Sequence, residues 1–254
     1  MNDLALRPRS PTELVDAAIQ IFRRDPIQFI VATAAVYVPW LVVRLMLDLG
    51  VSNELPTPQQ AMITVVAGVI VYALVGGVIT VIASDVYLGA PANAGEALQI
   101  ALARVVPLLV TGAVTLFFVL LGGILFLLPA LYPLARFFAV RQVVMLEDGG
   151  AATALARSSQ LSVGVKRHVL NTLLLVLLIT SAISLGVGFL SGFIPSRVVF
   201  NVILTAVHVV LYPFFGITET LLYYDIRIRK EGFDVEYLAA TTPAVGAGQP
   251  GDSR

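Results

Sequence analysis

The apolar positions of this chain form six long runs, which are separated by short polar or proline-rich stretches. A run of roughly 20 apolar residues lets a helix cross the hydrocarbon core of a bilayer, which is about 30 Å thick. The pattern therefore predicts six membrane spans. They run from about Ile27 to Leu47, Ala61 to Ala83, Leu108 to Leu128, Ala130 to Leu146, Val169 to Leu190 and Val198 to Tyr223.

Three shorter segments show the periodicity of an amphipathic helix. In the first, Leu14, Ala17 and Ile21 fall on one face. Ser10 and Pro11 form a typical helix start before them. These segments are too short and too polar to span, so we expect each to lie along the membrane interface. They begin near Glu13, Glu96 and Thr153.

The two ends of the chain differ in composition from the part between them. Residues 1–10 are polar and are predicted to be flexible, and residues 239–254 are rich in Ala, Thr, Pro and Gly and are predicted to be disordered. Residues 11–238 form one six-span membrane domain in this interpretation.

Composition supports the membrane class. Hydrophobic residues make up 58% of the 254 residues and charged residues 13%, whereas soluble domains contain about 25% charged residues. The fold class is therefore predicted to be an all-α integral membrane protein with six transmembrane helices and about three short interfacial helices. There is no cysteine, which excludes disulfides, thiolate metal sites and thiol nucleophiles. The formal net charge of zero gives no general attraction to nucleic acid.

The distribution of the basic residues predicts the orientation. Only Arg44 and Arg197 fall in the loops opposite the N-terminus. Because short cytoplasmic loops carry an excess of Lys and Arg, we expect both termini to be cytoplasmic. The basic residues on the N-terminal side are Arg7, Arg9, Arg23, Arg24, Arg104, Arg157, Lys166, Arg167, Arg227, Arg229 and Lys230.

Two arginines inside the fourth predicted span, Arg136 and Arg141, are the sharpest anomaly. An arginine at the centre of a span costs about 2.5 to 3.5 kcal/mol on an insertion scale, so both should have partners or water. Glu219 is a candidate partner for Arg141, with Asp85 and Glu147 as the others. One interpretation is a pocket for a lipid headgroup or an anion, and the other is an ion pair that only fixes helix packing.

His208 lies near the middle of the sixth predicted span and completes a candidate intramembrane polar cluster with Arg136, Arg141 and Glu219. It could relay protons, or it could be a neutral histidine bonded to a neighbouring helix. In the fifth predicted span, the spacing of Ser184, Gly188 and Gly192 predicts close approach of another helix.

Several basic residues are candidate contacts for lipid phosphate on the cytoplasmic face, where each cation contributes about 1 kcal/mol. His168 is expected to meet water or lipid phosphate beside them. The orientation of the spans requires the same cations without any ligand, so both interpretations stay open. The candidates are Arg23, Arg24, Lys166, Arg167, Arg227, Arg229 and Lys230.

No catalytic motif is present in the sequence. Asp225 and Glu231 do not belong to a set of His, Asp and Glu residues with metal-ligand spacing, and there is no phosphate-binding loop or nucleophile elbow. We therefore predict no catalytic, cofactor-binding or metal-binding residue, and no cofactor.

Three segments carry a family resemblance: Leu6 to Asp25, Val144 to Gly164 and Leu221 to Gly232. In these three segments, the chain resembles prokaryotic membrane proteins labelled "glycerophosphoryl diester phosphodiesterase membrane domain" and related families of unknown function. The resemblance implies a six-span protein of the prokaryotic cytoplasmic (inner) membrane, usually without an assigned activity. The soluble phosphodiesterase domain of that name is a barrel with paired histidines, whereas this chain has only His168 and His208.

The leading functional hypothesis is a non-enzymatic membrane protein that organises or assists other components through its cytoplasmic helices. The alternative is a small transporter or lipid-handling protein with an anion or headgroup site near Arg136 and Arg141. An intramembrane enzyme is the third. The expected partners are the bilayer and anionic lipid headgroups, with any protein partner left open and no nucleic acid. A cavity lined by Arg136 and Arg141 with unpaired donors would favour the alternative, and closure of both arginines in ion pairs would favour the leading hypothesis.

Overall fold

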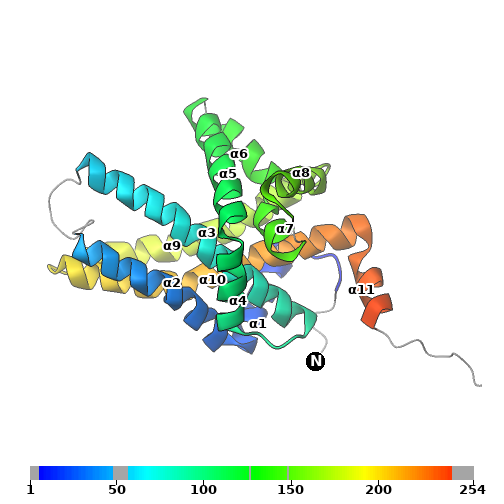
Figure 1. Cartoon of the computed structure of the whole chain (residues 1–254), viewed down its shortest axis with the longest axis horizontal. Helices are drawn as coiled ribbons and strands as arrows, with labels where there is room; N and C mark the ends of the chain where they lie inside the picture. The colour runs from blue at the N-terminus through cyan, green and yellow to red at the C-terminus, as the bar shows by residue number, and fades with distance from the viewer. Residues whose placement is uncertain (1–5, 48–56, 126, 148, 242–254) are drawn as a thin grey trace, which may run out of the picture.

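The computed structural model describes residues 6–47, 57–125, 127–147 and 149–241, and throughout these ranges the regular structure is helical (Figure 1). The all-α class predicted from the sequence is therefore confirmed. The helices are α1 (Pro11–Arg24), α2 (Pro26–Met46), α3 (Pro58–Leu88), α4 (Ala94–Ala103), α5 (Val105–Leu125), α6 (Leu127–Arg136), α7 (Val140–Leu146), α8 (Ala151–Ser162), α9 (Lys166–Ser191), α10 (Arg197–Glu231) and α11 (Phe233–Thr241).

Five helices in the described ranges are long and apolar enough to cross a membrane: α2, α3, α5, α9 and α10. They correspond to the first, second, third, fifth and sixth predicted spans. Two of them are longer than a bilayer requires, because α3 has 31 residues and α10 has 35. Roughly 20 residues suffice for a span, so both helices are longer than a perpendicular crossing needs.

The fourth predicted span, from Ala130 to Leu146, is not a single helix. It is divided between α6 and α7, which are separated at residues 137–139. Ser158 of α8 lies at this break, where its Oγ donates to the carbonyl of Arg136 and accepts from the amide of Ala139, both at 3.1 Å. A side chain that replaces helical hydrogen bonds in this way permits a sharp break. The prediction of a continuous span was wrong because the apolar run gives no sign of this contact from another helix.

Helices α5 and α6 form a hairpin that rises away from α3, α9 and α10 (Figure 1). Gly122 lies where the two helices approach closely, since a Cβ at this position would overlap the backbone of Ala130. Its neighbour Gly123 has open space around the same position. The tight hairpin therefore depends on one of these two adjacent glycines and not on the other.

We expect Gly122→Ala to destabilise the protein by about 1–3 kcal/mol, the usual cost of overpacking, because helix backbone cannot move aside cheaply. Gly123→Ala should leave stability unchanged or raise it by up to about 1 kcal/mol, since alanine favours a helix. Unfolding of both variants in mild detergent checks the prediction. Equal effects would show that the hairpin does not depend on close approach at Gly122.

The apolar face of α1 is covered by protein. Leu14, Ala17, Ala18 and Ile21 are fully buried, and α1 packs against α9 and α10. The start predicted for this helix is confirmed, but its apolar face is not left for a lipid surface. Periodicity identifies which face of a helix is apolar, and it does not identify what covers that face.

Residues 6–10 and 239–241 are the parts of the two chain ends that the structure describes. Arg9 is only 4% exposed, and its amide donates to Asp225 at 2.6 Å. Residues 239–241 belong to α11. The flexibility predicted for residues 1–10 and the disorder predicted for residues 239–254 stay predictions, and residues 1–5 and 242–254 lie outside the described ranges.

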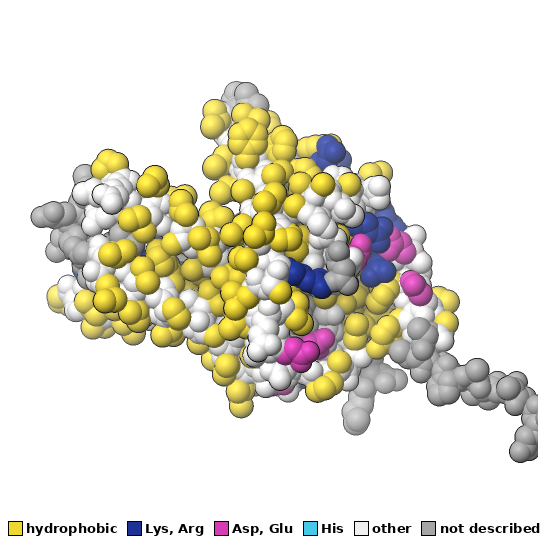
Figure 2. Space-filling view, viewed as in Figure 1, with side chains coloured by type: hydrophobic (Ala, Val, Ile, Leu, Met, Phe, Trp, Pro, Cys, Tyr) yellow, Lys and Arg dark blue, Asp and Glu magenta, His cyan; other side chains and the backbone are white. Residues whose placement is uncertain are grey.

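Charge is unevenly distributed over the molecule. Figure 2 shows a largely apolar surface over the end formed by α2, α3, α9 and α10, and over the α5–α6 hairpin. Charged side chains gather at the other end, near α4, α7 and α8. The molecule therefore has one end suited to lipid and one suited to water.

Candidate functional site

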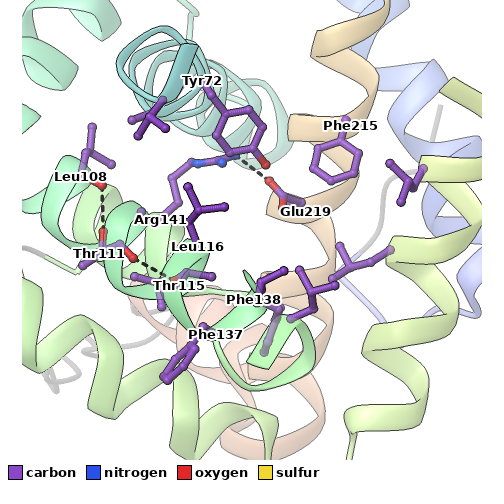
Figure 3. A pocket seen from close by; sticks show the side chains of 18 of the residues that line it. Tyr72, Leu108, Thr111, Thr115, Leu116, Phe137, Phe138, Arg141, Phe215 and Glu219 are labelled. Atoms are coloured by element: carbon purple, nitrogen blue, oxygen red, sulfur yellow. Dashed lines mark hydrogen bonds and ion pairs between the residues drawn. The ribbon is translucent and has the colours of Figure 1, made fainter. Parts of the chain in front are cut away.

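A cavity of about 610 Å³ lies between α3, α5, α6, α7, α9 and α10 (Figure 3). Its volume is within the range of roughly 300–1,000 Å³ that is usual for small-molecule sites. Most of its wall is apolar. Representative wall residues are Val65, Leu108, Leu116, Phe137, Leu173 and Phe215.

One end of the cavity carries an ion pair. Arg141 of α7 donates through Nη1 to Oε2 of Glu219 of α10 at 2.7 Å. The two side chains are 14% and 11% exposed, respectively. Of the three partners predicted for Arg141, the structure thus selects Glu219. Figure 3 shows the pair beside the ring of Tyr72, among the other side chains that line the cavity.

Helix α3 holds the guanidinium of Arg141 in place. The guanidinium carbon lies 4.6 Å from the centre of the Tyr72 ring, a geometry that is favourable for a cation over an aromatic face. One turn further along α3, a Cβ on Gly76 would overlap the guanidinium. Tyr72 and Gly76 therefore form a seat for Arg141, which the sequence showed only as an aromatic residue and a glycine in an apolar run.

Two threonines of α5 add hydroxyl groups to the cavity wall (Figure 3). Thr111 and Thr115 each donate to a carbonyl one turn earlier in α5, at 2.8 Å. A hydroxyl that donates in this way still has an oxygen that can accept. The cavity thus combines an apolar wall, an ion pair and hydroxyl oxygens. These threonines were not among the site residues predicted from the sequence.

The other two members of the predicted polar cluster lie elsewhere. Arg136 ends α6, is exposed, and donates through Nε to Ser159 of α8 at 3.0 Å. His208 lines a second cavity, and its ring stacks on that of Tyr37 with 6.1 Å between centres. The break between α6 and α7 separates Arg136 from Arg141, so the predicted cluster of four was wrong as a single site.

Four of the seven predicted lipid-phosphate contacts have partners within the protein. Arg227 donates to Glu231 at 3.0 Å. Lys230 donates to the carbonyl of Val163 at 2.6 Å. The ammonium group of Lys166 lies 4.2 Å from the centre of the Tyr132 ring. The fourth cation, Arg229, pairs with a carboxylate that is described below.

The other three predicted lipid contacts, Arg23, Arg24 and Arg167, are exposed. No ion pair joins any of them to another residue in the described ranges. These three cations are therefore available to a charged surface without the loss of an ion pair within the described ranges.

Asp225 of α10 joins three separate parts of the chain. Its side chain is 1% exposed and accepts from the Arg9 amide at 2.6 Å, from Nε2 of His168 at 2.9 Å and from Nε of Arg229 at 2.8 Å. The prediction that His168 meets water or lipid phosphate was therefore wrong. The carboxylate instead connects the N-terminal segment, α9 and α10.

A second charged group joins α7, α8 and α10. Arg157 of α8 donates to Glu147 at 2.9 Å and to Glu231 at 2.8 Å. Hydrogen bonding to these two carboxylates raises the pKa of Arg157 above its ordinary value. Glu147 also accepts from the Tyr223 hydroxyl at 2.7 Å. The charged end of the molecule is thus held together by ion pairs between helices.

Among the described residues, no group of three or more His, Asp or Glu side chains could hold a metal ion. Comparison with known proteins adds no assignment, because no family model, no curated protein and no solved structure matches this chain.

Proposed function

We propose that this chain is a non-enzymatic, multi-pass protein of the prokaryotic cytoplasmic membrane that binds one lipid molecule in the cavity beside Arg141 and Glu219. In this proposal, both termini are cytoplasmic. The chain is also proposed to be related to the prokaryotic membrane proteins that it resembles. The observation that carries the proposal is a cavity with an apolar wall and a single charged end. A lipid has the same division into apolar chains and a polar headgroup.

The position of the ion pair along α10 supports this assignment. Glu219 lies 219 − 197 = 22 residues after Arg197, where the helix begins. At about 1.5 Å per residue this is roughly 33 Å, close to the thickness of a hydrocarbon core. If Arg197 lies at one membrane boundary, Arg141 and Glu219 lie at the other, where lipid headgroups begin. A charged pair at that depth avoids most of the cost of a charge at the centre of a bilayer.

The chemistry of the charged end favours a headgroup over a free anion. Glu219 neutralises much of the charge of Arg141, so a small anion gains little there. A guanidinium carries five N–H donors, and Glu219 accepts from one nitrogen of Arg141. The end of the cavity therefore offers both donors and acceptors, which suits a headgroup with phosphate, hydroxyl or amine groups.

Retention of lipid by the purified full-length protein tests the proposal. The protein is exchanged into vesicles of phosphatidylethanolamine, phosphatidylglycerol and diacylglycerol, extracted in mild detergent and measured by native mass spectrometry. We expect one retained lipid, and its mass identifies the headgroup class. A protein that retains no lipid from any of the three would contradict the proposal.

Two glycines of α5 supply a matched pair of variants. Gly112 lines the cavity, Gly123 does not, and a Cβ on either would meet no atom within 4 Å. Gly112→Leu should fill part of the cavity and remove the retained lipid, while Gly123→Leu should keep it. Equal retention by the two variants would place the lipid outside this cavity.

A second candidate function is the organising or accessory role predicted from the sequence. The exposed cations Arg23, Arg24 and Arg167 favour it, because they could meet an anionic membrane surface or an acidic partner. Replacing all three by Gln should weaken binding of that partner without changing lipid retention. If these substitutions also abolish lipid retention, the two roles are not separate.

A further inference from the structure

A second cavity, of about 450 Å³, lies beside the first, between α3, α9 and α10. The two cavities share Tyr72, Leu177 and Phe215 in their walls. Six of the ten residues that line the second cavity have polar side chains. Its polar residues are Tyr72, Thr180, Ser181, Ser184, His208 and Tyr212.

The second cavity lies near the middle of the proposed span. His208 is 208 − 197 = 11 residues after the start of α10, which is about 16 Å along the helix. That is half of a hydrocarbon core about 30 Å thick. Polar and ionisable side chains at this depth are costly and commonly mark a path for a substrate or ion. In this protein, the polar side chains that carry this free-energy cost gather in the second cavity, beside the first.

The polar residues continue along α10 on one face. They are Asn201, Thr205, His208, Tyr212 and Glu219. Their intervals of four, three, four and seven residues keep them on the same side of a helix. Helix α9, which packs against α10, carries Thr180, Ser184 and Ser191. We call these eight residues the polar row. It extends from the beginning of α10 to the Arg141–Glu219 pair.

The polar row opens to the bilayer at His208 near its centre, while Asn201, Thr205 and Ser191 are buried. His208 is exposed, and Leu185, which lines the same cavity, is 72% exposed. A molecule in this cavity can keep its apolar part in the surrounding lipid while its polar part contacts the protein. This arrangement suits an amphiphile, whereas a water-soluble solute would need a path closed off from lipid.

We propose that the protein moves lipid between the two leaflets. The headgroup passes from the Arg141–Glu219 end of the first cavity into the second cavity and follows the polar row, while the acyl chains stay in the bilayer. This inference rests on the proposed function, because the first cavity supplies the lipid. No covalent step and no energy source are involved, so net movement follows the lipid gradient.

The test uses the full chain in vesicles that contain a trace of phosphatidylethanolamine with a fluorescent headgroup. Dithionite added outside destroys only the fluorescence of the outer leaflet. With wild-type protein we expect the loss to continue beyond the outer-leaflet share, as inner-leaflet lipid becomes accessible. Loss that stops at the level of protein-free vesicles would overturn the inference.

Variants locate the path. His208→Leu and Ser184→Leu replace polar groups of the second cavity by apolar ones and should slow lipid movement by at least about tenfold. Val210→Leu and Ile183→Leu are the controls, because both residues are exposed large hydrophobics of the same two helices that do not line the cavity. Equal slowing by variants and controls would overturn the assignment of the path.

The two proposals fail in different ways. Native mass spectrometry of His208→Leu should still find the lipid retained by wild-type protein, since the first cavity is unchanged. Retained lipid without movement in the wild type would overturn the leaflet-exchange inference and leave the binding function intact. Absence of both would overturn the binding function as well. Thermal unfolding of every variant identifies any that has lost its fold. Because Ser184→Leu and His208→Leu lie on different helices, either one that still folds tests the path.

Discussion

Replacement of Arg141 by Met is expected to destabilise the folded protein by about 3–5 kcal/mol, the usual cost of removing one partner of a buried ion pair. The carboxylate of Glu219, only 11% exposed, would then lie beside the cavity without its cation. Glu219→Gln should cost a similar amount for the reverse reason. Denaturant titrations of both variants in mild detergent measure the change in the free energy of unfolding.

The double variant Arg141→Met/Glu219→Gln distinguishes the contribution of the ion pair from the cost of leaving one charge unpaired. With both charges removed, neither is left alone, so the loss should be clearly smaller than the sum of the two single losses. Arg136→Met is the control for the arginine, since Arg136 is exposed and has no ion pair with another described residue. Its effect should stay within about 0.5–1 kcal/mol. Unchanged stability in both single variants and in the double variant would show that the pair does not contribute to the fold.

Replacement of Asp225 by Asn is expected to cost about 3 kcal/mol, because buried hydrogen bonds to charged groups are worth about 1.5–3 kcal/mol each. Asparagine keeps one acceptor oxygen but places an amide donor where His168 and Arg229 now donate. In the opposite orientation, the amide donor faces the Arg9 amide instead, so one part of this network loses its acceptor in either case. The N-terminal segment should therefore detach from α10 more often.

Limited trypsin digestion measures this detachment in addition to stability. Cleavage after Arg9, which is 4% exposed in the folded protein, should accelerate in Asp225→Asn. Asp16→Asn is the matched control, because Asp16 is exposed on α1. Equal cleavage rates in the two variants would mean that Asp225 does not hold the N-terminal segment.

Local signals in the sequence predicted the helix starts correctly. The start at Ser10 and Pro11 is present as a capping box, in which Ser10 Oγ accepts from the Glu13 amide and Glu13 accepts from the Ser10 amide at 2.8 Å. These bonds, with Arg7 beside the carboxylate, lower the pKa of Glu13 to about 2. The start of α4 is likewise capped by Asn93. Such interactions involve residues within one helical turn, so the sequence contains all of their parts.

The pairing of Arg141 with Glu219 was also within reach of the sequence. A cation and an anion in predicted spans, each costly alone, are expected to find each other when few alternatives exist. The partner of Arg136 was not predictable in this way. Ser159 is one of many serines, and its position depends on how α8 packs against the break between α6 and α7.

The sequence by itself determined the helical class, the apolar character of five membrane-length helices and the starts of the short helices. Each of these depends on composition, periodicity or contacts within one turn. Only the tertiary structure decided that the fourth apolar run is divided, that His168 binds Asp225, and that Arg141 lines a cavity while Arg136 does not. These features depend on which helix faces lie together and in what register, and apolar faces of similar residues carry little information about their partners.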